Sequence, residues 1–143
     1  MAVVLRIWAF NPLKGNIGHA SLEVGQGKSG RYMSVWPSGK FDNKGVSATK
    51  TEDFNAEGGD AWYQVTFLSL DEQKMIRYWD RLSSTNSLTY SNFMYGFNCM
   101  TNAAMLLTCG GGCDPIEEWY RFVTIQEHWS LLWYATSMKS QGW

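Results

Sequence analysis

The stretch YGFNCMTNAAMLL, residues 95–107, decides how the helical half of this chain is organised. Asn98 is a favoured helix N-cap, so a helix is predicted to begin at Cys99 and to end at Gly110. At the first turn, unpaired backbone N–H groups and the positive end of the helix dipole favour a thiolate. Cys109 lies at the opposite end, where the dipole disfavours one. The alternative interpretation of Cys99 is a small, buried hydrophobic residue.

The first half of the chain has the composition of strands separated by turns. Residues 19–24 and 31–36 are separated by six turn-forming residues, which predicts an antiparallel hairpin. Residues 37–61 are polar and glycine-rich, and we expect a long loop there that is either functional or mobile. The predicted strands are 3–10, 19–24, 31–36 and 62–70.

Helical periodicity replaces the strand pattern after residue 70. Ser69 and Glu72 form one capping-box signature, and Thr124 and Glu127 form another. A further helix is predicted to start at Asp114, with proline at its first position. Strands grouped before helices predict an α+β fold with an antiparallel sheet packed against helices. At 143 residues, the chain is expected to form a single domain over residues 1–143.

Charge and hydropathy exclude several classes of protein. The formal net charge of −1 gives no electrostatic basis for binding nucleic acid. No apolar run reaches the roughly 18 residues of a membrane-spanning helix. The apolar start, MAVVLRIWAF, is interrupted by Arg6 and has no cleavage site, so a strand is expected rather than a signal peptide. We therefore expect a soluble protein, either cytoplasmic or exported by a route that needs no signal peptide.

The inventory of metal-binding and phosphate-binding residues is short. The chain has two histidines and three cysteines, without a CxxC or HxxxH pair, so no metal is expected. No glycine-rich phosphate loop is present, and no cofactor is expected. Cys109 and Cys113 flank three glycines and are either bridged or free. Cys99 and Cys109 are about 15 Å apart along the helix, too far for a disulfide.

His19 is the candidate base for a Cys99 nucleophile. It begins a predicted strand directly after Gly18, whose missing side chain permits a close backbone approach. The other histidine, His128, lies on a late helix and is expected to be structural or exposed. Ser34, on the following strand, is the candidate for orienting the imidazole, through its hydroxyl or its backbone. Glu23 shares the strand face of His19 but lies about 13 Å away along it.

An oxyanion formed at Cys99 needs hydrogen-bond donors. The backbone N–H of Cys99 is one, and the side chain of Asn98, Asn102 or Tyr95 is the candidate for another. Trp36 is the tryptophan nearest in sequence to the proposed site and is a candidate wall of a substrate cleft. These residues complete the predicted site.

The segments GHASLEV, YMSVWP and YGFNCMTNAAMLL, in this order, resemble the circularly permuted papain-like hydrolases. This group includes permuted NlpC-type peptidases, PPPDE peptidases and relatives of lecithin:retinol acyltransferase. The resemblance implies a fold in which the histidine strand precedes the cysteine helix, with His19 as base and Cys99 as nucleophile. The family's third polar residue usually follows on the next strand, where this chain has Ser34 rather than His, Asp, Asn or Gln.

The resemblance implies a cysteine hydrolase that cleaves a peptide or amide bond through an acyl-enzyme, as several secreted bacterial effectors do. Its substrate would be a peptide, a cell-wall peptide or an acyl compound, and a protein inhibitor is a possible partner. Two alternatives stay open. One is an acyltransferase or lipid hydrolase on the same dyad, and the other is a non-catalytic interaction module.

Overall fold

The fold is known from a computed structural model, which describes residues 2–11, 13, 18–38, 44–85, 87–88, 90, 98–111 and 125–143. Its strands are β1 (Val3–Trp8), β2 (His19–Val24), β3 (Arg31–Met33), β4 (Val35–Pro37), β5 (Gly45–Ser47) and β6 (Tyr63–Phe67). Its α-helices are α1 (Lys50–Ala56), α2 (Glu72–Ser84), α3 (Cys99–Gly110) and α5 (His128–Ser140). The class is α+β, as the sequence predicts.

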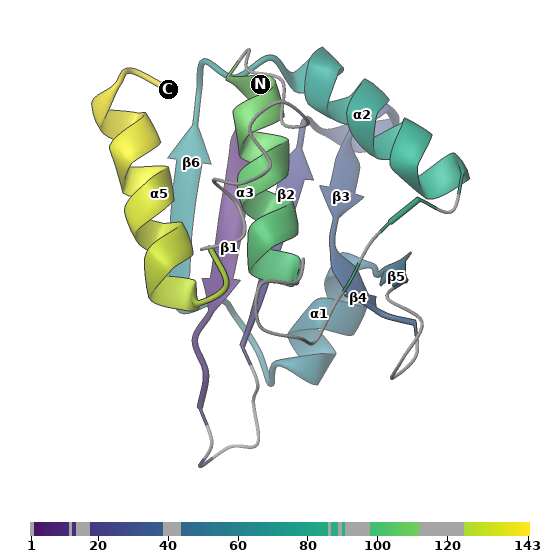
Figure 1. The fold of residues 1–143 in the computed structure, drawn as a ribbon, viewed down its shortest axis with the longest axis vertical. Coiled ribbons are helices and arrows are strands. Elements are labelled where there is room, and N and C mark those ends of the chain that lie inside the picture. Colours follow the sequence, from purple (N-terminus) through teal and green to yellow (C-terminus); the bar gives the residue numbers. More distant parts are fainter. Residues whose placement is uncertain are drawn as a thin grey trace.

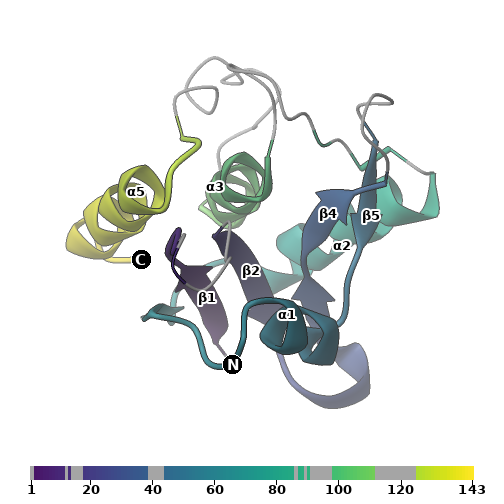
Figure 2. The same cartoon turned by 90° about the horizontal axis from the view of Figure 1, so that it is seen from below.

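An antiparallel sheet with the strand order β3-β2-β1-β6 forms the centre of the molecule. Helices α3 and α5 cover one face of this sheet, and α2 packs beside α3 (Figure 1). Helix α1 lies on the other side of β1 and β2, as the view from below shows (Figure 2). Strands β4 and β5 form a separate two-stranded sheet. The sheet therefore separates α1 from α3 except at the strand ends.

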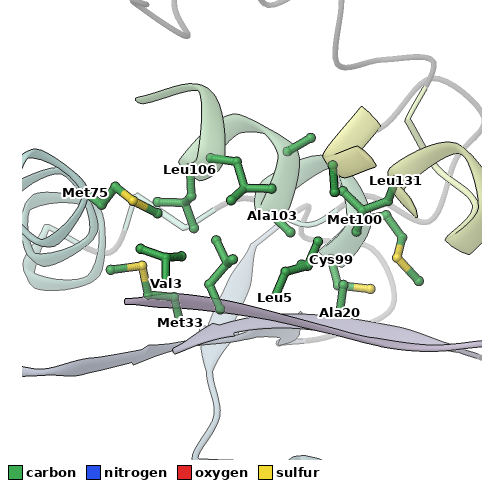
Figure 3. Packing of buried hydrophobic residues seen from close by; sticks show 14 of the residues in the cluster. Val3, Leu5, Ala20, Met33, Met75, Cys99, Met100, Ala103, Leu106 and Leu131 are labelled. Carbon is green, nitrogen blue, oxygen red and sulfur yellow. The ribbon is translucent and has the colours of Figure 1, made fainter. Parts of the chain in front are cut away.

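The hydrophobic core lies between α3 and the sheet (Figure 3). Alternate residues of β1, namely Val3, Leu5 and Ile7, are fully buried against it. Helix α3 is buried on nearly all sides because α2, α5 and the sheet all contact it. This explains the run of alanine, methionine and leucine that follows Cys99, which itself lies in this layer with Ala20.

The structure corrects the prediction of a long loop over residues 37–61. Strand β5 and helix α1 both lie within that range. Thr49 caps α1, because its hydroxyl accepts a hydrogen bond from the backbone N–H of Glu52 (3.2 Å) and the Glu52 carboxylate accepts one from the Thr49 N–H (3.2 Å). Residues 50–56 thus form a helix that begins at a capping box.

Other element boundaries also differ from the sequence prediction. The strand expected over 31–36 is divided at Ser34, whose carbonyl accepts a hydrogen bond from Ala48 in place of a ladder partner. Asp71, rather than Ser69, caps α2, since its side chain accepts from the Lys74 N–H. Glu127 precedes α5 as its N-cap. The helix expected from Asp114, and Thr124, lie outside the described residues.

Candidate active site

Helix α3 positions Cys99 at its first turn. The Asn98 side chain accepts hydrogen bonds from the backbone N–H groups of Met100 (2.9 Å) and Thr101 (3.1 Å), which confirms Asn98 as the N-cap. The Asn98 amide also donates to the Gln126 carbonyl (3.0 Å), which ties the helix start to the segment before α5. The Cys99 side chain is 6% exposed. The Cys99 sulfur therefore lies at the positive end of a firmly capped helix.

Gly18 and β1 fix the position of His19. Gly18 has φ of 87°, and a Cβ on it would lie 3.1 Å from the Trp8 carbonyl oxygen, so only glycine fits without strain. His19 is the first residue of β2 and pairs with Trp8 across the sheet. Its ring stacks on Trp36 at 4.3 Å between centroids and also contacts Trp8. The imidazole is 1% exposed and has little freedom to rotate.

A buried carboxylate on α1, that of Asp53, contacts the Nε2 nitrogen of this imidazole. The Nε2 atom of His19 is 3.0 Å from Oδ2 of Asp53, which is completely buried. The Asp53 carboxylate also accepts hydrogen bonds from the Trp36 indole N–H at Oδ1 (2.7 Å) and from the Tyr32 hydroxyl at Oδ2 (2.7 Å). Burial alone would raise the pKa of Asp53, but His19, Trp36 and Tyr32 together lower it. Asp53 is therefore an ionised group inside the protein.

The Cys99 side chain also acts on His19, since it contributes to the raised pKa of the imidazole. Since Nε2 faces Asp53 and Ser34, Nδ1 is the nitrogen left for the sulfur. Burial by itself would lower the pKa of His19, but the hydrogen bonds and charges of Asp53 and Cys99 raise it to about 9. The arrangement therefore favours an imidazolium paired with the Asp53 carboxylate.

Ser34 contacts the histidine, as expected, but it is not the charged partner. Its hydroxyl lies 2.8 Å from Nε2 of His19, beside the Asp53 oxygen that shares this nitrogen. A carboxylate stabilises an imidazolium far better than a neutral hydroxyl does. The sequence interpretation missed Asp53 because residues 37–61 were expected to be a loop. The TxxE capping signature at Thr49–Glu52 was the available signal for a helix there.

Of the other residues predicted for the site, only some lie beside His19 and Cys99. Trp36 is in place beside the dyad, but it stacks on His19 and donates to Asp53, so it supports the base as well as bordering the site. Asn102 donates to the Asn98 carbonyl (2.9 Å), and both amides thus serve the start of α3. Tyr95 lies outside the described residues. Burial, with a further contribution from Cys99, raises the pKa of a different tyrosine, Tyr90.

Two further findings concern metal ions and membrane-spanning helices. Within the described ranges, no group of three or more His, Cys, Asp or Glu side chains is arranged to hold a metal ion. Of the helices in the described part of the chain, none has the length and apolar character to cross a bilayer.

Comparison of the chain with family models, curated proteins and solved structures finds no match. The chemical interpretation therefore depends on the geometry of Cys99, His19 and Asp53.

The raised pKa of His19 predicts a specific titration. We expect the His19 ring resonances to titrate near pH 9 in NMR spectra, rather than near the ordinary value of 6.5. His128 is the only other histidine, so only two sets of ring resonances have to be assigned. Because the folded-state pKa is raised, protonated His19 stabilises the fold fully below pH 6.5, and this contribution is lost as the pH rises through about 9. A His19 titration at or below 6.5 would contradict the ion pair.

Proposed function

We propose that this protein is a cysteine hydrolase that cleaves a peptide or amide bond, with Cys99 as nucleophile and His19 as base and acid. One observation carries the proposal: the buried imidazole of His19 lies 3.0 Å from the buried carboxylate of Asp53, and the Cys99 side chain helps to raise the pKa of the same imidazole. A nucleophile, a base and a group that orients the base are the minimal machinery for acyl transfer.

The first half of the reaction forms an acyl-enzyme. In the starting state His19 holds the proton of the Cys99 thiol, and the thiolate attacks the carbonyl carbon of the substrate, whose oxygen becomes an oxyanion. The oxyanion then collapses, and the bond between carbon and nitrogen breaks as the imidazolium gives its proton to the leaving amine. Asp53 keeps the ring oriented and stabilises its positive charge throughout.

The second half returns the enzyme to its starting state. Neutral His19 takes a proton from water, which attacks the thioester carbon. The carboxylic acid product leaves as the sulfur departs, and the imidazolium holds the proton for the next cycle. The arrangement supports the resemblance to circularly permuted papain-like hydrolases, because the histidine strand precedes the cysteine helix. We extend the proposal to peptide or cell-wall peptide substrates, and to a bacterial effector restrained by a protein inhibitor.

A second candidate is acyl transfer to an acceptor other than water, on the same dyad. Trp129 and Trp133 lie four residues apart on α5 and are 65% and 75% exposed. Exposed tryptophans of this kind are typical of surfaces that meet a lipid interface or a partner. A purely non-catalytic module is less well supported, since the missing third polar group that favoured it is supplied by Asp53.

The first test compares the two cysteines of α3. In fully reduced protein at pH 7, we expect iodoacetamide to alkylate Cys99 on the order of 10²-fold faster than Cys109. The two side chains are 6% and 2% exposed, so access alone does not explain such a difference. Peptide mapping by mass spectrometry assigns the modified residue, and Cys99→Ala and Cys109→Ala are the paired controls. Equal, slow alkylation of both residues would overturn the proposed function.

A second measurement identifies the reaction. p-Nitrophenyl acetate should give a burst of p-nitrophenolate and an acetylated Cys99 that intact mass detects, whereas Cys99→Ala gives neither. Peptidoglycan fragments, ubiquitin-like conjugates and phospholipids then distinguish the substrate classes by the acyl group that remains on the sulfur. Transfer of this group to an added amine or alcohol in preference to water would favour the acyltransferase.

A further inference from the structure

Polar side chains from two strands and a helix meet on the face of the sheet where α1 lies (Figure 2). His19 and Ser21 are two residues apart on β2, so their side chains point to the same face. Tyr32 of β3 pairs with Glu23, the next residue of β2 on that face. Its hydroxyl lies 2.8 Å from Oγ of Ser21 and 2.7 Å from Oδ2 of Asp53. Tyr32 therefore connects the strand that carries His19 with the helix that carries Asp53.

The Tyr32 hydroxyl has one proton and can donate to only one of these two oxygens at a time. Asp53 is the better acceptor because its carboxylate is charged. Burial raises the pKa of Tyr32 above its ordinary value, and Asp53 raises it further, although Ser21 and Arg6 act in the opposite direction. The phenol thus keeps its proton and donates a hydrogen bond to Oδ2, while the Ser21 hydroxyl can donate to the phenol oxygen.

The carboxylate of Asp53 meets donors at both of its oxygens. Oδ2 lies 3.0 Å from Nε2 of His19 and accepts from Tyr32, and Oδ1 accepts from the indole N–H of Trp36. Because an indole N–H can only donate, a proton on Oδ1 would face another proton. A proton on Oδ2 would compete with the hydrogen bond from Tyr32. Tyr32 and Trp36 therefore favour an ionised Asp53 and leave the shared proton on Nε2.

We propose that Tyr32 is a positioning residue for the reaction, which holds Oδ2 of Asp53 on Nε2 of His19 and keeps the carboxylate from taking the imidazole proton. This inference depends on the proposed function. Tyr32 acts through Asp53, so no bond to Tyr32 forms or breaks, and its proton stays on the hydroxyl. If Asp53 took the Nε2 proton, His19 would be neutral with its remaining proton on Nδ1. At that nitrogen it could then take no proton from the thiol or from water.

Other titratable groups also act on this network, and a substitution of Tyr32 leaves them in place. Glu57, which follows α1, is buried, and its charge interacts with that of His19. Cys99 on α3 contributes to the raised pKa of His19, and Arg6 on β1 lowers the pKa of Tyr32. A change that follows removal of the Tyr32 hydroxyl alone can therefore be assigned to its hydrogen bond with the carboxylate.

The test is Tyr32→Phe, with Tyr78→Phe as the matched control. Tyr78 lies on α2, and its hydroxyl donates to the sulfur of Met105 (3.9 Å). We expect Tyr32→Phe to raise the pKa of Asp53 by about one unit, measured by ¹³C NMR of the carboxyl carbon, because the charged form loses a donor. Acylation by p-nitrophenyl acetate should fall on the order of 10-fold, which is part of the roughly 10²- to 10⁴-fold that general acid–base catalysis contributes. Tyr78→Phe should change neither quantity, and thermal unfolding should show that both variants remain folded.

The two readouts distinguish this inference from the proposed function. If the wild-type protein is acylated and Tyr32→Phe leaves the pKa of Asp53 unchanged, Tyr32 is a packing residue and the inference is overturned, whatever the acylation rate. If the pKa of Asp53 rises but acylation stays at the wild-type rate, the reaction does not need the hydroxyl, and the positioning role is overturned. If the wild-type protein is never acylated although the pKa of Asp53 rises in Tyr32→Phe, the hydrolase function is overturned, and the hydrogen bond from Tyr32 to Asp53 is supported.

Discussion

Asp53→Asn is expected to leave the protein folded and to lower the rate of acyl-enzyme formation on the order of 10³- to 10⁴-fold. Asparagine has nearly the shape of aspartate, but one of its two polar atoms is a donor. The Trp36 indole N–H can only donate, so the carbonyl oxygen of the substituted side chain must occupy the position of Oδ1. The amide NH₂ then occupies the position of Oδ2, facing Tyr32 and His19.

Tyr32 and His19 can both hydrogen-bond to the new amide, but His19 then loses its function as a base. The Tyr32 hydroxyl can donate to Ser21 (2.8 Å) and accept from the new amide. His19 can accept at Nε2 only if it is neutral with its proton on Nδ1, the nitrogen that faces Cys99. In this tautomer Nδ1 already carries a proton and cannot take the thiol proton. The expected result is a folded protein with its base in the wrong tautomer.

The measurement combines three readouts on Asp53→Asn and on the control Asp80→Asn. Asp80 is partly exposed and pairs with Arg31 (2.8 Å), away from the dyad. Acylation by p-nitrophenyl acetate gives the rate, ¹⁵N NMR of the imidazole gives the tautomer, and thermal unfolding gives the stability. Asp80→Asn should match the wild-type rate. A fully active Asp53→Asn would show that Asp53 does not orient the base.

The sequence predicts that Cys99 begins a helix and that His19 begins a strand, because both placements depend on local signals. An asparagine cap specifies the start of α3, and Gly18 allows the backbone to enter β2 beside Trp8. With two histidines in the chain, few pairings had to be considered. The predicted hairpin of 19–24 with 31–36 is confirmed for residues 31–33, which pair with β2, because short-range turn residues set a hairpin, whereas residues 35–37 pair with β5 instead.

Asp53 could not be predicted in this way because its contact is made over a long sequence separation. Asp53 lies 34 residues from His19, on a helix of seven residues that is too short for a clear hydrophobic period. What holds α1 against the sheet is tertiary packing, in which Phe54 meets Trp8 edge to face.

His19→Gln is expected to have a larger effect than Asp53→Asn, because it removes the base itself. Acylation by p-nitrophenyl acetate should fall by at least about 10⁴-fold, and alkylation of Cys99 at pH 7 should slow toward the rate of Cys109. Glutamine has a similar reach and can still hydrogen-bond to Ser34 and Asp53, so the fold should survive. It cannot take the thiol proton, and it provides no positive charge for the thiolate.

His128→Gln is the matched control, because it makes the same substitution at the only other histidine, the first residue of α5. It should acylate and alkylate at the wild-type rates. Raising the pH distinguishes the two roles of His19. In the His19→Gln variant, alkylation of Cys99 by iodoacetamide should return to the wild-type rate once the pH is high enough to ionise the thiol. Turnover of the acyl-enzyme should not recover, because general acid–base catalysis is still missing. If Cys99 of the His19→Gln variant were alkylated at the wild-type rate at pH 7, the reactivity of Cys99 would not depend on His19.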